Sequence, residues 1–199
     1  MRDSKLYDIA YFISDLMILN LLWIVFSLPV VTIFQSTEAL FRSVHLLRKD
    51  EGEGVWKEFW KAFKKHFWWM LINFVITVAV ILILYVDVRF FIQQNTAFAY
   101  ILAGLLLSMG LMFLITLIYT FLTIQYYEGK LFGLWKTSFL LGLGHLPQTI
   151  LIILTLLTAL ILANIMPILF FIILASVSAY VIDIIFEGVI RKYIKKDKE

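Results

Sequence analysis

Four long stretches of this sequence contain no Asp, Glu, Lys or Arg, and this feature constrains the fold more than any other. The stretches are residues 16–37, 66–86, 90–127 and 137–182, and together they make up 127 of the 199 residues. A transmembrane helix needs roughly 20 apolar residues to cross about 30 Å of hydrocarbon. The sequence therefore predicts an all-α integral membrane protein, a helical bundle that forms a single membrane domain over residues 1–199.

Composition supports this fold class and argues against several functions. Hydrophobic residues make up 62% of the chain and the mean hydropathy is +0.94, whereas soluble domains are roughly 45–50% apolar. The chain has no cysteine, which excludes disulfides and thiolate metal sites. It also lacks nucleotide-binding and zinc-protease motifs. We expect no cofactor, no metal site, no nucleic-acid partner and no enzymatic activity.

The apolar stretches divide into five predicted membrane spans, at about residues 16–34, 67–86, 98–124, 147–163 and 167–185. A polar turn, Gln93 to Thr96, opens the third stretch and separates two spans. The fourth stretch is divided at Asn164 to Pro167, because proline lacks a backbone donor and disfavours helix in the preceding residue.

The distribution of Lys and Arg predicts the orientation of these spans. With five spans, the connector after span 1, the connector after span 3 and the C-terminal tail share one side and carry 14 of the 17 basic residues. Basic loops stay in the cytoplasm. This rule places the basic tail in the cytoplasm and, with five full crossings, the N-terminus outside.

Span 1 has an alternative path. It contains Asn20 and Pro29, and it could enter the membrane and return to the same side as a re-entrant segment. The basic residues would then divide 16 against 1, which satisfies the charge rule better. Re-entrant backbone needs surrounding protein or water, and the length of the stretch favours a full crossing. Both paths stay open at this point.

Two connectors share a pattern that predicts a tandem repeat. Glu53-Gly54 precedes Trp60-Lys61, and Glu128-Gly129 precedes Trp135-Lys136, each pair offset by 75 residues. Repeated units of this kind occur in membrane transport proteins. The predicted halves are residues 14–88 and 97–163, followed by a fifth helix and basic tail over 167–199.

The first connector predicts an amphipathic helix. Its aromatic residues follow helical spacing on one face, and its lysines occupy the other: Trp56, Phe59, Trp60, Phe63 and Phe67 against Lys57, Lys61, Lys64 and Lys65. Such a helix typically lies in the headgroup plane, and it could instead dock a partner protein. The second connector has a similar, less charged stripe. The candidate docking residues are Trp56, Trp60, Lys61, Trp135 and Lys136.

Polar residues within the spans are the remaining candidates for function. Asp183, Glu187 and Arg191 share one helix face near the end of span 5. They form either a self-neutralising ladder or a polar seam that faces a partner subunit or an ion path. Asn20, Asn73 and Asn164 are expected to bond neighbouring helices, and Asp15 is expected to cap span 1.

The first third of the chain resembles a known family. Residues 15–23 read Asp-Leu-Met-Ile-Leu-Asn-Leu-Leu-Trp, residues 27–32 read Ser-Leu-Pro-Val-Val-Thr, and residues 36–40 read Ser-Thr-Glu-Ala-Leu. These segments, with Phe59 to Phe67 of the first connector, resemble the YesL-like family of small bacterial membrane proteins. The resemblance is firm over residues 15 to about 70. Phe34 departs from it, because a small residue is expected at that position.

The resemblance implies a cellular context and no mechanism. Members of this family are typical of Gram-positive bacteria and are often encoded beside carbohydrate-uptake ABC transporters. It therefore implies a multi-pass protein of the plasma membrane that contacts the lipid bilayer and the permease subunits of a sugar transporter. A homo-oligomer is left open. The family has no established catalytic or ligand residues that could be transferred to this sequence.

Two functions follow from these observations. The first is an accessory subunit linked to bacterial carbohydrate uptake, which uses its connectors to dock. The alternative is a small stand-alone transporter or channel, with a pathway between its two halves lined by Asn20, Asn73, Asn164 and Asp183.

Overall fold

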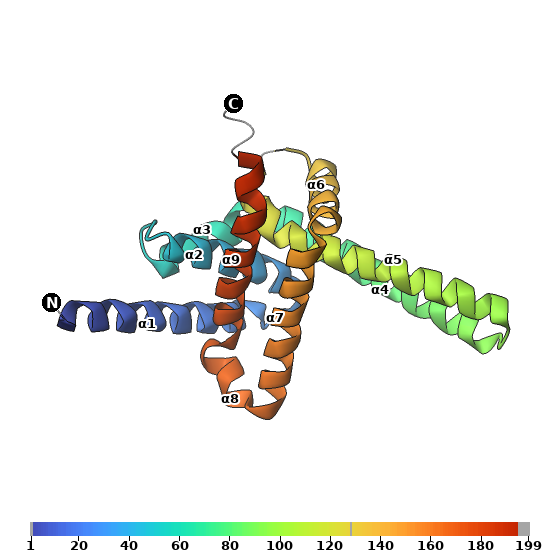
Figure 1. Cartoon of the computed structure of the whole chain (residues 1–199), viewed down its shortest axis with the longest axis horizontal. Helices are drawn as coiled ribbons and strands as arrows, with labels where there is room; N and C mark the ends of the chain where they lie inside the picture. Colours follow the sequence, from blue (N-terminus) through green and yellow to red (C-terminus); the bar gives the residue numbers. More distant parts are fainter. Residues whose placement is uncertain (1, 128, 195–199) are drawn as a thin grey trace. The chain divides into compact units, whose positions relative to one another are not determined.

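The computed structural model describes residues 2–127 and 129–194, and side chains within 7–127 and 129–190. Every regular element in these ranges is a helix (Figure 1). The elements are α1 Arg2–Ser27, η1 Val30–Thr32, α2 Ile33–Arg48, α3 Val55–Lys65, α4 Phe67–Gln93, α5 Ala97–Thr123, η2 Ile124–Tyr126, α6 Leu131–Gly144, α7 Leu146–Ile165, α8 Pro167–Leu169, the π-helix η3 Phe170–Leu174 and α9 Ala175–Ile194.

Five helical segments in the described ranges are long and apolar enough to cross a membrane. They are Tyr7–Ser27, Phe67–Gln93, Ala97–Tyr126, Leu146–Ile165 and Pro167–Ile190. The predicted all-α helical bundle is confirmed, and its described part contains five helical segments with the length and composition of a membrane span.

The predicted limits of span 1 are wrong. Residues 16–34 do not form one helix, because α1 ends at Ser27 and α2 begins at Ile33. Pro29 precedes the short turn η1, and the Thr32 hydroxyl donates to the Phe26 carbonyl at 2.6 Å. Because α1 begins at Arg2, Asp15 lies inside the helix and is not its cap.

The breaks between the other spans fall where the sequence predicts them, although α4 and α9 continue past the predicted ends of spans 2 and 5 at residues 86 and 185. α4 ends at Gln93, and Thr96 caps α5 by accepting a hydrogen bond from the Ala99 amide at 3.3 Å. α7 ends at Ile165 and Pro167 begins the next segment. Both connectors contain the expected helix, α3 in the first and α6 in the second.

The chain divides into two compact units. Unit 1 comprises Met1–Met70 and His145–Glu199, and unit 2 comprises Leu71–Gly144. These limits differ from those of the predicted halves, 14–88 and 97–163, and the tandem repeat stays a prediction. The Glu128 of the second repeat pair lies outside the described residues.

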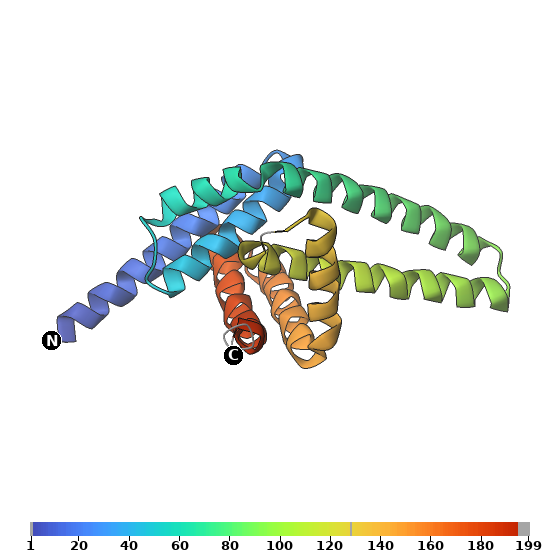
Figure 2. The same cartoon turned by 90° about the horizontal axis from the view of Figure 1, so that it is seen from above.

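In unit 1, α1, α2 and α3 lie beside one another, and α7 and α9 lie across them (Figures 1 and 2). The ring of Phe26, near the end of α1, lies 5.6 Å from Phe59, 5.4 Å from Trp60 and 5.2 Å from Phe63 of α3. The Trp23 indole donates to the Thr37 hydroxyl of α2 at 3.2 Å. These contacts hold the three helices together.

In unit 2, α4 and α5 follow one another as a hairpin, and α6 packs on α5. α6 approaches α5 closely at Gly142. A Cβ added there would lie 2.7 Å from Ile115 Cγ2 of α5, which is too close for an unshifted side chain. Glycine therefore permits this helix contact.

Candidate functional site: a charged cluster between α2 and α9

The last span carries two acidic residues on the face that meets α2. Asp183 is completely buried, and the side chain of Glu187 is 16% exposed. Asp183 and Glu187 are four residues apart on α9, so they lie one turn apart on the same face. The sequence predicted that these two residues share a helix face.

Basic groups of α2 bind both carboxylates. His45 Nδ1 lies 2.9 Å from Asp183 Oδ1, and Arg48 Nε donates to Asp183 Oδ2 at 2.7 Å. The Arg48 guanidinium also pairs with Glu187, with Nη2 2.5 Å from Oε2. Lys49 Nζ lies 3.9 Å from Glu187 Oε1, at the edge of the cluster. We call these five residues the charged cluster.

The cluster is internally compensated. Two carboxylates face one guanidinium, one ammonium and an imidazole. Burial alone would lower the pKa of Arg48, but its hydrogen bonds to Asp183 and Glu187 and their negative charges raise the pKa above its usual value. Arg48 therefore stays charged, and removal of a partner would leave a buried charge unpaired.

A second buried pair lies nearer the start of α2. Glu38 is 1% exposed, and its Oε1 lies 3.1 Å from Nδ1 of His66, the residue between α3 and α4. Thus His45 and His66 each face a different carboxylate. Within residues 7–127 and 129–190, no group of three or more His, Asp or Glu side chains could hold a metal ion.

Asn20 of α1 is fully buried and binds the π-helix of the last span. Its Nδ2 donates to the carbonyls of Phe170 and Phe171 at 2.9 and 3.0 Å. Its Oδ1 accepts from the amides of Ala175 and Ser176 at 2.9 and 3.3 Å. A π-helix shifts the backbone bonding pattern, and lipid cannot satisfy the groups this frees. The Asn20 amide supplies the missing partners.

The other two predicted amides differ from each other. Asn73 of α4 accepts a hydrogen bond from the Trp135 indole of α6 at 2.7 Å, within unit 2. Asn164 is exposed and donates to the Leu160 carbonyl of its own helix at 2.8 Å. The structure thus brings Asn73 together with Trp135, and it places Asn20 and Asp183 in unit 1 at different points along the last span.

The aromatic stripe predicted for the first connector is part exposed and part buried. Trp56 and Trp60 of α3 are 58% and 38% exposed, and Lys61 and Lys136 are exposed. Phe59 and Phe63 of the same predicted stripe are buried against α1. Phe67 belongs to α4, so the stripe of α3 ends at Phe63.

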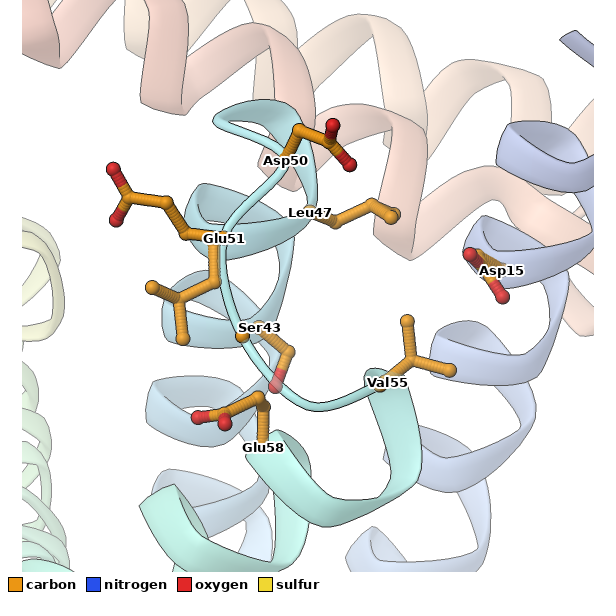
Figure 3. Close-up of a pocket in the computed structure, with 10 residues that line it drawn as sticks. Asp15, Ser43, Leu47, Asp50, Glu51, Val55 and Glu58 are labelled. Carbon is orange, nitrogen blue, oxygen red and sulfur yellow. The ribbon is translucent and has the colours of Figure 1, made fainter. Parts of the chain in front are cut away.

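An acidic hollow of about 160 Å³ lies between α1, α2 and the loop before α3. Asp15, Asp50, Glu51 and Glu58 line it, and Figure 3 shows Asp15 on the wall opposite Glu51. Glu58 Oε1 accepts a hydrogen bond from the Glu53 amide at 3.4 Å. Gly52 and Gly54 both have a φ of 106°, which glycine adopts without strain. The carboxylates lie on different walls and do not surround a common point.

Sequence reasoning missed the basic half of the charged cluster. Asp183 and Glu187 stood out because they interrupt an apolar run, whereas His45, Arg48 and Lys49 lie in a connector rich in charges. The available signal was the spacing of Glu38, His45 and Arg48, which places them near one face of a helix. The side chain of Arg191, the predicted third member of the ladder, lies outside the described residues.

Comparison with known proteins gives one family. Residues 16–88 match the family described as a protein of unknown function, DUF624. The matched region contains most of α1, all of α2 and α3, and most of α4. No curated protein and no solved structure matches the chain.

Proposed function

We propose that this multi-pass membrane protein is an accessory subunit linked to carbohydrate uptake in the bacterial plasma membrane, with its C-terminal tail in the cytoplasm. The observation that carries the proposal is the charged cluster. The carboxylates of the last span are bound by α2 of the same unit, so they stabilise the fold instead of lining an open path. The proposed link to sugar uptake comes from the YesL-like segments of residues 15–40.

We assign the docking role to α6. Its inner face is used within unit 2, where Leu134, Ser138 and Leu141 are buried and Trp135 binds Asn73. Its outer face is free of these contacts: Phe132 is 78% exposed, Phe139 is 39% exposed and Lys136 is exposed. An exposed aromatic face with a basic residue suits a contact with another membrane protein.

Co-purification tests this function. The tagged protein, solubilised in mild detergent, should carry the permease subunits of a sugar ABC transporter, and its deletion should reduce sugar uptake. Phe132→Ser combined with Lys136→Glu should release the permease, whereas Trp56→Ser on α3 should not. If the protein elutes alone and deletion leaves uptake unchanged, the proposal fails.

The alternative, a stand-alone transporter or channel, has less support. Of the four residues proposed to line its pathway, Asn20 bonds the π-helix, Asp183 bonds α2, Asn73 bonds α6 and Asn164 bonds its own helix. Substrate flux into liposomes that contain only this protein, abolished by Asp183→Asn in a variant that remains folded, would favour the alternative.

A further inference from the structure

The helices α1, α2 and α3 of unit 1 run side by side. Two contacts show that α1 runs along α3 from its start to its end. Asp15 of α1 lines the same hollow as Asp50 and Val55, which lie beside the start of α3. Phe26, eleven residues further along α1, contacts Phe63 near the end of α3. The segment of α1 from Asp15 to Phe26 therefore follows α3 over most of its length.

α3 cannot lie within the hydrocarbon, because Lys57, Lys61, Lys64 and Lys65 are all exposed along it. A lysine at the membrane centre is costly, and four lysines of α3 are exposed to the surroundings of the protein. A helix that follows α3 must run along the membrane plane as α3 does. α1 therefore does not cross the membrane beside it.

We call α1, α2 and α3 together the layer. Contacts with the last span, Pro167–Ile190, show at which points along this span α1 and α2 lie. α1 meets this span at the π-helix through Asn20, and at Tyr180, whose ring lies 5.5 Å from that of Phe12. α2 meets it further toward the C-terminus, at Asp183 and Glu187. Figures 1 and 2 both show α1, α2 and α3 lying across α7 and α9. Since α7 and the segment Pro167–Ile190 can span a membrane, helices that lie across them run along its plane.

The exposed side chains of α1 and of α3 suit different depths in the membrane. On α1, Ile18, Leu21 and Val25 are 42%, 53% and 55% exposed, as suits a helix immersed among acyl chains. On α3, the exposed groups are aromatic and cationic, with Trp56 58% and Trp60 38% exposed. Lys64 Nζ lies 4.4 Å from the centre of the Trp60 ring. Tryptophan with lysine is the composition of a membrane–water interface.

Three of the lysines lack an acidic partner within the described part of the chain. Lys57 Nζ lies 3.7 Å from Glu53 Oε2, whereas Lys61, Lys64 and Lys65 form no ion pair with residues 7–127 or 129–190. Lys64 and Lys65 immediately precede His66 and Phe67, where the span Phe67–Gln93 begins. Their position next to the start of a span places them at the level of lipid phosphates.

We propose that α1, α2 and α3 form a layer along one face of the membrane, with α1 immersed below the headgroups, and that α3 binds anionic phospholipid headgroups through Lys61, Lys64 and Lys65. Four segments then cross the membrane: α4, α5, α7 and the continuous segment from α8 to α9. Residue 8 and residue 51 lie on the same side. The inference does not depend on the sugar-transporter partner.

Cysteine labelling tests the layer, because the natural chain contains no cysteine. Asp8→Cys, Glu51→Cys and Gln94→Cys would each be treated in intact cells with a membrane-impermeant maleimide. Positions 8 and 51 should be protected until the cells are opened, and position 94, in the turn between α4 and α5, should react from outside. Reaction of position 8 from outside while position 51 is protected would overturn the layer, because α1 would then cross.

Lipid quenching tests the headgroup site. In nanodiscs, brominated phosphatidylglycerol should quench the tryptophan fluorescence more than brominated phosphatidylcholine does. The variant with Lys61, Lys64 and Lys65 all changed to Gln should lose this preference, since each lysine near an anionic surface changes partition by about fivefold. Lys57→Gln, on the same helix but paired with Glu53, should keep most of it. An unchanged preference in the triple variant would overturn the site.

Discussion

The two units of the molecule are held together by different chemistry. In unit 1, buried polar and charged side chains join segments far apart in the sequence: Asn20 to the π-helix, Arg48 and His45 to Asp183, and Glu38 to His66. In unit 2, the prominent polar bond between helices is Trp135 to Asn73, and the approach at Gly142 is a packing contact.

The difference follows from what each unit must join. Unit 1 assembles residues 1–70 with residues 145–199, and apolar helices in lipid gain little from apolar contact alone. Directional bonds between buried polar groups can select one pairing among many. Unit 2 is continuous in sequence, so short connections already bring its helices together. Stability measurements in mixed micelles can test this contrast.

The largest effect is expected at the centre of the charged cluster. Asp183→Leu leaves Arg48 and His45 without their buried carboxylate, and we expect a loss of about 3–5 kcal/mol in the free energy of unfolding. The triple variant Asp183→Leu, Arg48→Met and Glu187→Gln should recover much of the loss, because Arg48 pairs with both carboxylates and neutral side chains can replace a buried ion-pair network only if all three charges are removed. A single-variant loss below about 1 kcal/mol, typical of an exposed pair, would contradict the structure.

A smaller loss is expected at the π-helix. Asn20→Leu removes the partners of two carbonyls and two amides, and we expect a cost of about 1–3 kcal/mol. Hydrogen exchange at Ala175 and Ser176 should become faster. Asn164→Leu is the matched control, because Asn164 is exposed and bonds within its own helix, and its stability should stay within about 0.5 kcal/mol of the natural protein.

Unit 2 should respond less to loss of its polar bond. Trp135→Phe removes the indole N–H that Asn73 accepts, and bonds of this kind between membrane helices contribute about 0.6–1.7 kcal/mol. Trp56→Phe, at an exposed tryptophan, serves as the control. A loss as large as that of Asp183→Leu would break the contrast between the two units.

The smallest effect is expected at the edge of the charged cluster. Lys49 Nζ lies 3.9 Å from Glu187, and its side chain is 35% exposed. Lys49→Gln should therefore change the free energy of unfolding by less than about 1 kcal/mol. A cost equal to that of losing Asp183 would show that Lys49 belongs to the buried core of the cluster.

Features that depend on neighbouring residues could be predicted from the sequence. The helices α3 and α6, the turn at Gln93 to Thr96 and the break before Pro167 follow from hydropathy, glycine and proline within a few residues. Span 1 was placed too late, because its polar first turns hid the helix before Asp15, and because Pro29 was taken as internal to the span. The helix α2 lay in a charged connector that gave no apolar stretch to detect.

The candidate site could be predicted only in part. Asp183 and Glu187 were visible because charge is costly in an apolar run, but their partners lie about 135 residues away in sequence. Asn20 was expected to bond a neighbouring helix, and its four bonds to the π-helix required knowing that the last span contains one.

By itself, the sequence determined that this chain folds as helices in lipid, because its uncharged stretches are long enough to cross a bilayer and backbone groups in lipid must bond within the segment. Only the tertiary structure decided which polar groups meet. A buried carboxylate needs a basic partner, and the folded chain supplies one by bringing α2 beside α9. Hydropathy along the sequence does not show that these two helices are neighbours.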